Sequence, residues 1–159
     1  MAKWERKVVI EYLGTAMDVR PYLAKADCLV LPSYCEGVPR TLLEAAAMGK
    51  PLIATGAPGC HDVVIDGKTG WLCPVKDAAA LADCMSQLLA MPVADRQAMG
   101  LAGRRFIVKN FDEQKVVAHY LATLARYGLG KSEAWNLAQR AVLLVKSASS
   151  PINISGIRY

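Results

Sequence analysis

Two glutamates, Glu36 and Glu44, stand eight positions apart in the stretch from Leu31 to Gly59. Glu36 lies in a loop that contains Gly and Pro, and Glu44 lies among good helix formers that begin near Pro39. An ionised carboxylate only accepts hydrogen bonds, and it can accept two from a diol such as a ribose. The spacing suits two acids that grip different hydroxyl-bearing parts of one ligand. The open alternative is that Glu44 complements the helix dipole and that Glu36 is an exposed loop acid.

The start of the helix near Pro39 offers a site for an anion. The first amides of a helix have no partner within it, and the dipole makes that end positive. Such an end suits a diphosphate. Gly37 lets the backbone approach a ligand closely, and Arg40 and Thr41 add a cation and a hydroxyl. We therefore expect phosphates to lie between the two carboxylates.

Metal chemistry is not indicated by the sequence. The five cysteines form no Cys-x-x-Cys pair, and only two histidines are present, so the spacing typical of a zinc site is missing. We expect no metal and no cofactor beyond the ligand itself, and free thiols in a reducing compartment. His61 follows an expected strand and could reach the site, or it is a solvated loop residue.

Alternating strands and helices must position these residues. Apolar runs predict strands over 8–14, 27–32 and 51–55, and helical periodicity predicts helices over 18–26 and 39–50. This order is typical of parallel strands joined by right-handed crossovers. Further strands are expected at 63–65 and 71–73 around a turn, then helices from Asp77, the last of them an amphipathic helix from Asp112. Doubly wound domains have about six strands, so the predicted fold class is α/β: a Rossmann-like parallel half-sheet flanked by helices.

The composition is that of a globular chain, with 53% hydrophobic and 21% charged residues. A net charge of +5 suits an anionic partner, but the basic residues are scattered, so nucleic acid is not favoured. No apolar run reaches 18 residues and no signal peptide is evident, so we expect a cytoplasmic chain. Residues 134–148 are expected to form a helix that docks on its own domain or, alternatively, makes peripheral contact with the inner face of the membrane.

Several segments in series resemble the C-terminal domain of the family 4 glycosyltransferases. They are the lead-in "YLG…DVRPYLAKADCLVLPS", the run "VPRTLLEAAAMGKPLIAT", the turn "DGKTGWL" and the helix "FDEQKVVAHYLATL", from about Val8 to Tyr127. Glu36 and Glu44 match the two glutamates, separated by seven residues, that mark this family. The resemblance implies the GT-B fold and transfer of a hexosyl unit from a nucleotide-diphosphate sugar, with retention at the anomeric carbon. The acceptor is expected to be a polysaccharide or glycolipid.

The resemblance also implies a role for each matching residue. Glu36 would be the catalytic residue, in contact with sugar hydroxyls near the reacting carbon, and Glu44 would bind the ribose. The other donor-binding residues would be Gly37, Val38, Thr41 and Leu42 through their backbone amides, together with Arg40 and His61, the candidates raised above.

Parts of the family's architecture have no match in this sequence. The Arg/Lys pair that binds donor phosphates would precede Val8, and the acceptor site lies on an N-terminal domain. We assign residues 1–127 to the nucleotide-sugar-binding domain, with its N-terminal part missing, and 128–159 to an extra helix and tail of unknown role. The isolated chain is expected to be inactive, with the apolar face of its helix near 116–124 turned toward the missing domain. Two alternatives remain open: a non-catalytic nucleotide-sugar-binding module, and a GT-B nucleotide-sugar epimerase.

Overall fold

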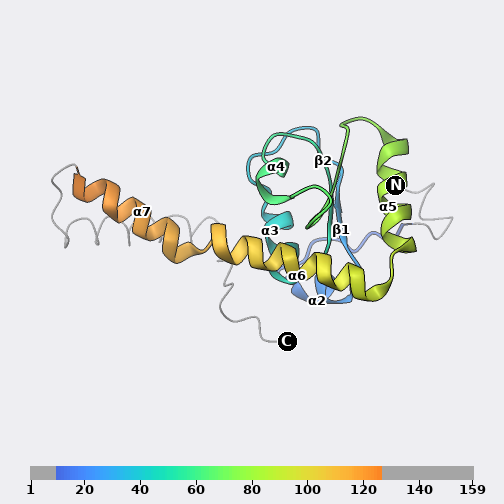
Figure 1. Cartoon of the computed structure of the whole chain (residues 1–159), viewed down its shortest axis with the longest axis horizontal. Coiled ribbons are helices and arrows are strands. Elements are labelled where there is room, and N and C mark those ends of the chain that lie inside the picture. The colour runs from blue at the N-terminus through green and yellow to red at the C-terminus, as the bar shows by residue number, and fades with distance from the viewer. Residues whose placement is uncertain (1–9, 127–159) are drawn as a thin grey trace.

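The structure is a computed structural model that describes residues 10–126. In this part of the chain, strands and helices alternate as far as β3, and only helices follow (Figure 1). The strands are β1 (Leu29–Leu31), β2 (Leu52–Thr55) and β3 (Gly70–Cys73). The helices are α2 (Arg20–Lys25), α3 (Arg40–Ala47), α4 (Cys60–Val63), α5 (Ala78–Ala90), α6 (Val93–Asn110) and α7 (Glu113–Arg126). The extra helix and tail expected over 128–159 lie outside the described residues.

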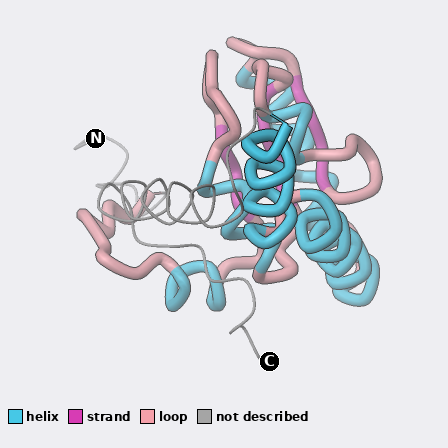
Figure 2. Tube along the Cα trace, turned by 90° about the vertical axis from the view of Figure 1, so that its left-hand side faces the viewer, coloured by secondary structure: helices cyan, strands magenta, loops and turns pink. Residues whose placement is uncertain are grey.

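The three strands form one parallel sheet in the order β1-β2-β3. Leu52 of β2 is in register with Leu29 on one side and with Gly70 on the other. All four residues of β2 are buried, so the centre of the core lies on this strand. Helix α3 connects β1 to β2, and Figure 2 shows helices packed beside the strands. The predicted α/β fold, a parallel half-sheet flanked by helices, is confirmed.

The prediction of a strand over 8–14 is wrong for the residues that the structure describes. Residues 10–14 have no regular secondary structure, and Ile10 and Leu13 are each 55% exposed. Among the described strands, β1 pairs only with β2, and residues 10–14 do not pair with its open edge. The helices expected over 18–26 and 39–50 do form, as the shorter α2 and α3.

The prediction of two strands around the turn at 66–70 is wrong for the first strand, 63–65, and right for the second, 71–73. Residues 60–63 form the short helix α4, which buries Cys60 and Val63, and Val64 is in extended backbone at its end. The second run, residues 70–73, is a true strand, but it pairs in parallel with β2 instead of with 63–65. The connection through α4 returns the chain to the end of the sheet where β2 began, as a parallel pair of strands requires.

Helix α3 is fixed by its contact with α6. Leu42, Ala45 and Ala46 of α3 are fully buried, and the Arg104 guanidinium of α6 donates a hydrogen bond of 2.7 Å to the carbonyl of Ala47. Gly100 allows the close approach, because a Cβ at that position would lie 1.8 Å from the carbonyl oxygen of Gly49. These contacts leave the first turn of α3 at the carboxyl edge of the sheet.

Helix α7 differs from the other long helices. In Figure 1 it continues beyond the sheet, and none of its residues is buried. Val116 and Tyr120, on the face expected to be apolar, are 47% and 63% exposed. What this face contacts stays a prediction. Across residues 10–126, none of the helices combines the length and the apolar character needed to span a membrane.

Candidate functional site

The loops that follow the three parallel strands meet at one edge of the sheet. Residues 32–39 lead from β1 to α3, 56–59 from β2 to α4, and 74–77 from β3 to α5. The Gly56 amide donates to the Cys73 carbonyl at 2.8 Å, and the Lys76 ammonium lies 5.6 Å from the centroid of the Tyr34 ring. Open α/β sheets place their ligand sites at this edge, so these loops form the candidate site.

Glu36 is a half-buried carboxylate with a defined partner. The Ser33 hydroxyl donates a hydrogen bond of 2.6 Å to Glu36 Oε1. The carbonyl of Ser33 in turn accepts a hydrogen bond from the hydroxyl of Thr55, the last residue of β2. The carboxylate predicted to be catalytic is therefore tied to the end of the central strand and not loose in a solvated loop.

The backbone of Glu36 and Gly37 packs directly on Gly59. A Cβ at Gly59 would lie 1.5 Å from the Gly37 carbonyl oxygen and 2.9 Å from that of Glu36. Gly59 also has φ +82°, a conformation that L side chains rarely adopt. Only glycine fits here, and the loop after β2 therefore lies against the loop after β1.

The first turn of α3 lies next to Glu36 and is open to solvent. Pro39 is the N-cap, without a side-chain cap, and Gly37, Val38 and Thr41 are exposed. The Pro39 carbonyl accepts hydrogen bonds from the amides of Leu42 at 3.1 Å and Leu43 at 3.3 Å. The amides of Gly37, Val38 and Thr41 have no acceptor within residues 10–126. They are donors at the positive end of a helix.

Glu44 lies one turn into α3, beside Arg40. The guanidinium Nη2 of Arg40 lies 3.6 Å from Glu44 Oε1, and the side chains are 47% and 23% exposed. Such a partly exposed i,i+4 pair contributes on the order of 0.5 kcal/mol. Glu44 can therefore exchange this partner for a ligand at little cost in stability.

Two predicted donor-binding residues, His61 and Leu42, differ in where the structure places them. The His61 ring lies over Gly56, since a Cβ on Gly56 would be 3.3 Å from His61 Nε2, which brings His61 to the loop after β2. Leu42 has a fully buried side chain, and its amide already donates to Pro39. A ligand bond from the Leu42 amide would have to share or replace that bond. The structure thus brings His61 to the candidate site, whereas Leu42 serves mainly as a core residue.

Cys60, the first residue of α4, lies close enough to Glu36 for the two to interact electrostatically. Burial raises the pKa of its thiol, and the negative charge of Glu36 raises it further. A raised pKa keeps the thiol protonated and unreactive. Cys60 is fully buried and serves as a small core residue beneath the site.

Three residues of this edge were not singled out from the sequence. Ser33 and Thr55 follow or end strands, and no spacing rule marks a hydroxyl that will bond a neighbouring loop. Lys76, with φ +63°, is the one non-glycine residue with positive φ within the described range. Its ammonium lies over the ring of Tyr34. The only available signal was position, because each follows or ends a strand at the carboxyl edge.

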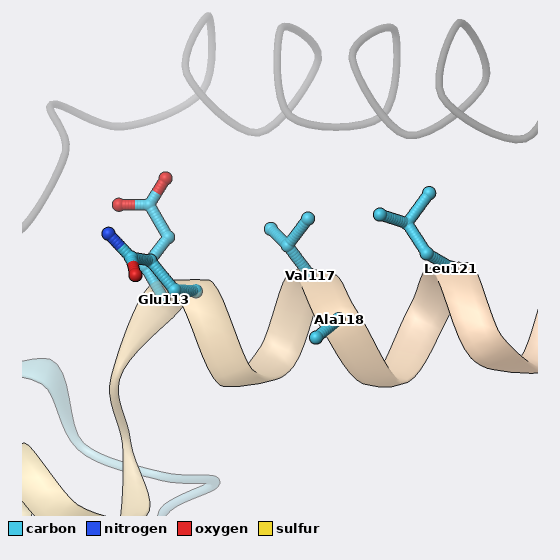
Figure 3. Close-up of a pocket in the computed structure, with 5 residues that line it drawn as sticks. Glu113, Val117, Ala118 and Leu121 are labelled. Atoms are coloured by element: carbon cyan, nitrogen blue, oxygen red, sulfur yellow. The ribbon is translucent and has the colours of Figure 1, made fainter. Parts of the chain in front are cut away.

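A shallow surface hollow occurs elsewhere, on α7. It is lined by Glu113, Gln114, Val117, Ala118 and Leu121. Figure 3 shows that Glu113, Val117 and Leu121 project from the same side of this helix. The described residues that line it include one acid and no cation, a composition that does not favour a phosphorylated ligand. Within the part of the chain that the structure describes, no three His, Cys, Asp or Glu side chains are grouped to hold a metal ion.

Comparison with known proteins gives consistent matches. A family model described as glycosyl transferases group 1 matches residues 2–91. The chain is 37% identical over 109 residues to N-acetyl-alpha-D-glucosaminyl L-malate synthase of Bacillus anthracis, covering 69% of this chain and 28% of that protein. It is 39% identical over 94 residues to glycogen synthase of Mycobacterium tuberculosis, covering 59% of this chain and 22% of that protein. The chain thus spans about a quarter of the length of these relatives.

Solved structures share the fold. Sucrose-phosphate synthase from Thermosynechococcus elongatus superposes with a TM-score of 0.70 at 29% identity, covering 79% of this chain and 32% of that one. Anabaena Alr3699/HepE in complex with UDP-glucose superposes with a TM-score of 0.71 at 21% identity, covering 79% of this chain and 35% of that one. At 21% identity the second likeness shows the fold alone.

Proposed function

The chain belongs to the glycosyl transferases of group 1, and on this premise we propose that it is the donor-binding half of a retaining hexosyltransferase. The donor is a nucleotide-diphosphate sugar, and the acceptor is a polysaccharide or glycolipid. One observation carries the proposal: the start of α3 presents amide donors that have no acceptor among residues 10–126, with Glu36 before it and Glu44 one turn into it.

The diphosphate binds at the start of α3. The amides of Gly37, Val38 and Thr41 donate to its oxygens, and the helix dipole favours its negative charge. The space beside Gly37 is open, because a Cβ there would meet nothing within 4 Å. A ligand can therefore approach this backbone closely. Arg40, at the first helical position, adds a cation beside the same amides.

The two carboxylates bind the two ends of the donor. Glu44 accepts hydrogen bonds from the ribose diol, and the weak exposed pair with Arg40 gives way to it. Glu36 accepts from hydroxyls of the transferred sugar near the anomeric carbon, with His61 as a further sugar contact from the loop after β2. Glu36 is then the catalytic residue, because it alone of these groups lies beside the reacting carbon.

The rest of the reaction requires parts that this chain does not supply. The chain spans about a quarter of the length of its relatives. We assign the acceptor site to an N-terminal domain, and the Arg/Lys pair that completes the phosphate site to earlier strands of the donor-binding domain itself. Residues 10–126 accordingly bind the donor, and the complete protein transfers the sugar.

Calorimetry with the 159-residue chain tests the proposal. The ligands are UDP-glucose, ADP-glucose and GDP-mannose, each with its nucleoside diphosphate. Hydrogen bonds to a charged group contribute about 1.5–3 kcal/mol. Glu44→Gln should therefore lower the affinity for the nucleotide sugar and for its nucleoside diphosphate by about tenfold or more. Glu36→Gln should weaken only the nucleotide sugar. Glu113→Gln, an exposed acid in the first turn of α7, is the matched control and should change nothing.

The outcomes separate the proposal from its alternatives. Failure of the wild-type chain to bind any ligand of the panel, or equal affinity in Glu44→Gln, would refute the donor site. Conversion of the bound nucleotide sugar into an epimer, without an acceptor, would favour the epimerase. Sugar transfer by the complete protein, lost in Glu36→Gln, would exclude the non-catalytic module.

A further inference from the structure

The side chain of Glu36 is connected to the central strand through two hydrogen bonds in series. The Thr55 hydroxyl donates to the Ser33 carbonyl, and the Ser33 hydroxyl donates to Glu36 Oε1 at 2.6 Å. Thr55 is only 3% exposed and is the last residue of β2, whose four residues are all buried. The first bond thus anchors the loop after β1 to the most rigid part of the sheet.

The backbone of Glu36 is braced from the same side. Gly59, in the loop after β2, packs so closely that a Cβ on it would lie 2.9 Å from the Glu36 carbonyl oxygen. The loop after β2 therefore limits the movement of the Glu36 backbone, and Ser33 limits the movement of its side chain. An acid held in both ways loses little conformational freedom when a ligand arrives.

The Ser33 bond occupies one carboxylate oxygen and leaves the other available. No second hydrogen bond joins the Glu36 carboxylate to any residue in the described range 10–126. An ionised carboxylate has about four acceptor positions, so Oε2 can accept from a ligand hydroxyl while Oε1 stays bonded to Ser33. The bond from Ser33 then fixes the direction in which Oε2 points.

We propose that Ser33 and Thr55 are positioning residues that orient Glu36 toward the sugar of the donor. Thr55 fixes the loop backbone at Ser33, and Ser33 fixes the carboxylate of Glu36. This inference rests on the proposed function, since it takes Glu36 to be the sugar-contacting acid. Neither Ser33 nor Thr55 touches the donor; both act through Glu36, which must be held within a fraction of an ångström to act on a reacting carbon.

A purely structural role for Ser33 predicts a different result. Loss of a bond that only maintains the loop would weaken the nucleoside diphosphate and the nucleotide sugar alike, because Gly37 and Val38 belong to the same loop. Loss of a bond that orients Glu36 weakens only the ligand that carries the sugar. The ratio of the two affinities therefore distinguishes the roles.

The test measures that ratio by calorimetry with whichever pair of the panel (UDP-glucose and UDP, ADP-glucose and ADP, or GDP-mannose and GDP) binds best. Ser33→Ala should weaken the nucleotide sugar by about tenfold, equivalent to about 1.4 kcal/mol, and the nucleoside diphosphate by less than about twofold. Ser33→Thr keeps the hydroxyl and should restore most of the affinity. Ser86→Ala is the matched control, because the Ser86 hydroxyl only donates to the Ala82 carbonyl within α5.

A double-mutant cycle then asks whether Ser33 acts through Glu36. In the Glu36→Ala background, Ser33→Ala should have no further effect on the nucleotide sugar. Thr55→Val keeps the shape of the side chain but frees the loop backbone at Ser33, so it should weaken binding of the nucleotide sugar more than binding of the nucleoside diphosphate, and Thr55→Ser should restore both. The inference is overturned by additive effects in the cycle, or by equal losses for the two ligands. No binding by the wild-type chain would instead overturn the proposed function, and this inference with it.

Discussion

Replacement of Gly59 by alanine tests the contact that brings the loops after β1 and β2 together. The new Cβ would lie 1.5 Å from the Gly37 carbonyl oxygen, so the backbone of one loop must move. Alanine at φ +82° adds backbone strain of about 1–2 kcal/mol. Forcing the loops apart adds about 1–3 kcal/mol, the usual range for an overpacked site. The free energy of unfolding should fall by about 2–5 kcal/mol in total.

Gly67 provides a control that separates these two contributions. It also has positive φ, at +70°, but a Cβ there would meet nothing within 4 Å. Gly67→Ala should therefore show only the backbone strain, about 1–2 kcal/mol. Urea denaturation of the wild type and both variants gives the free energies of unfolding. If Gly59→Ala and Gly67→Ala lower the free energy of unfolding by amounts that agree within about 0.5 kcal/mol, the close packing of Gly59 on Gly37 is refuted.

Three further predictions follow from single residues. Gly37→Ala should change stability by less than about 0.5 kcal/mol, because its Cβ meets no atom; it should weaken nucleoside diphosphate binding in calorimetry, and unchanged affinity would count against the backbone site. Asp77→Ala removes the carboxylate that accepts the Ala80 amide at the start of α5 and should lower the free energy of unfolding in urea by about 1 kcal/mol; an unchanged midpoint would show that this cap is not formed. Iodoacetamide near neutral pH should modify the exposed Cys35 first, as mass spectrometry can show. Burial raises the pKa of the four other thiols and so lowers their thiolate fraction; they are Cys28, Cys60, Cys73 and Cys84. Modification of any of these four as fast as that of Cys35 would contradict the prediction.

The same thiols give the chain a pH dependence of stability. Their raised pKa values mean that the folded state holds these protons more tightly than the unfolded state. The corresponding stabilisation is complete below the ordinary thiol pKa and is lost as the pH rises through the folded-state values. Stability should therefore decline on the alkaline side, where exposed thiols already ionise.

Helix α3 and the parallel sheet were predictable because strong local signals agree there. Pro39 at the start, Gly49 at the end and a buried apolar stripe between them all specify one helix of nearly the observed length. The same signals predicted that Glu36 would come just before the helix and Glu44 one turn into it. The roles assigned to these residues stay predictions.

The topology after β2 was not predictable from pattern alone. Short apolar runs on either side of a Gly-containing turn fit a hairpin as well as they fit a helical turn followed by a parallel strand. Burial decides between them: α4 buries Cys60 and Val63 beneath the candidate site, and β3 completes its pairing against β2. The run at 10–14 shows the same limit, since its apolar pattern fits a strand but it does not pair with the open edge of β1.

Ser33 and Thr55 were beyond the reach of the sequence for another reason. The hydrogen bond from the Thr55 hydroxyl to the Ser33 carbonyl joins residues 22 positions apart, and hydroxyl side chains carry no periodicity that predicts a distant partner. The packing of Gly59 against Gly37 and Glu36 holds the two loops together. Long-range contacts of this kind follow from the complete fold and not from local preference.

The central claim, that the first turn of α3 holds a diphosphate, is tested most directly by NMR of the ¹⁵N-labelled chain during a titration with inorganic pyrophosphate. This probe carries no base and no sugar, so it reports on the anion site alone. We predict the largest amide shifts at Gly37, Val38 and Thr41, with little change along α7. Shifts spread over the scattered lysines and arginines, with these three amides unmoved, would contradict the account.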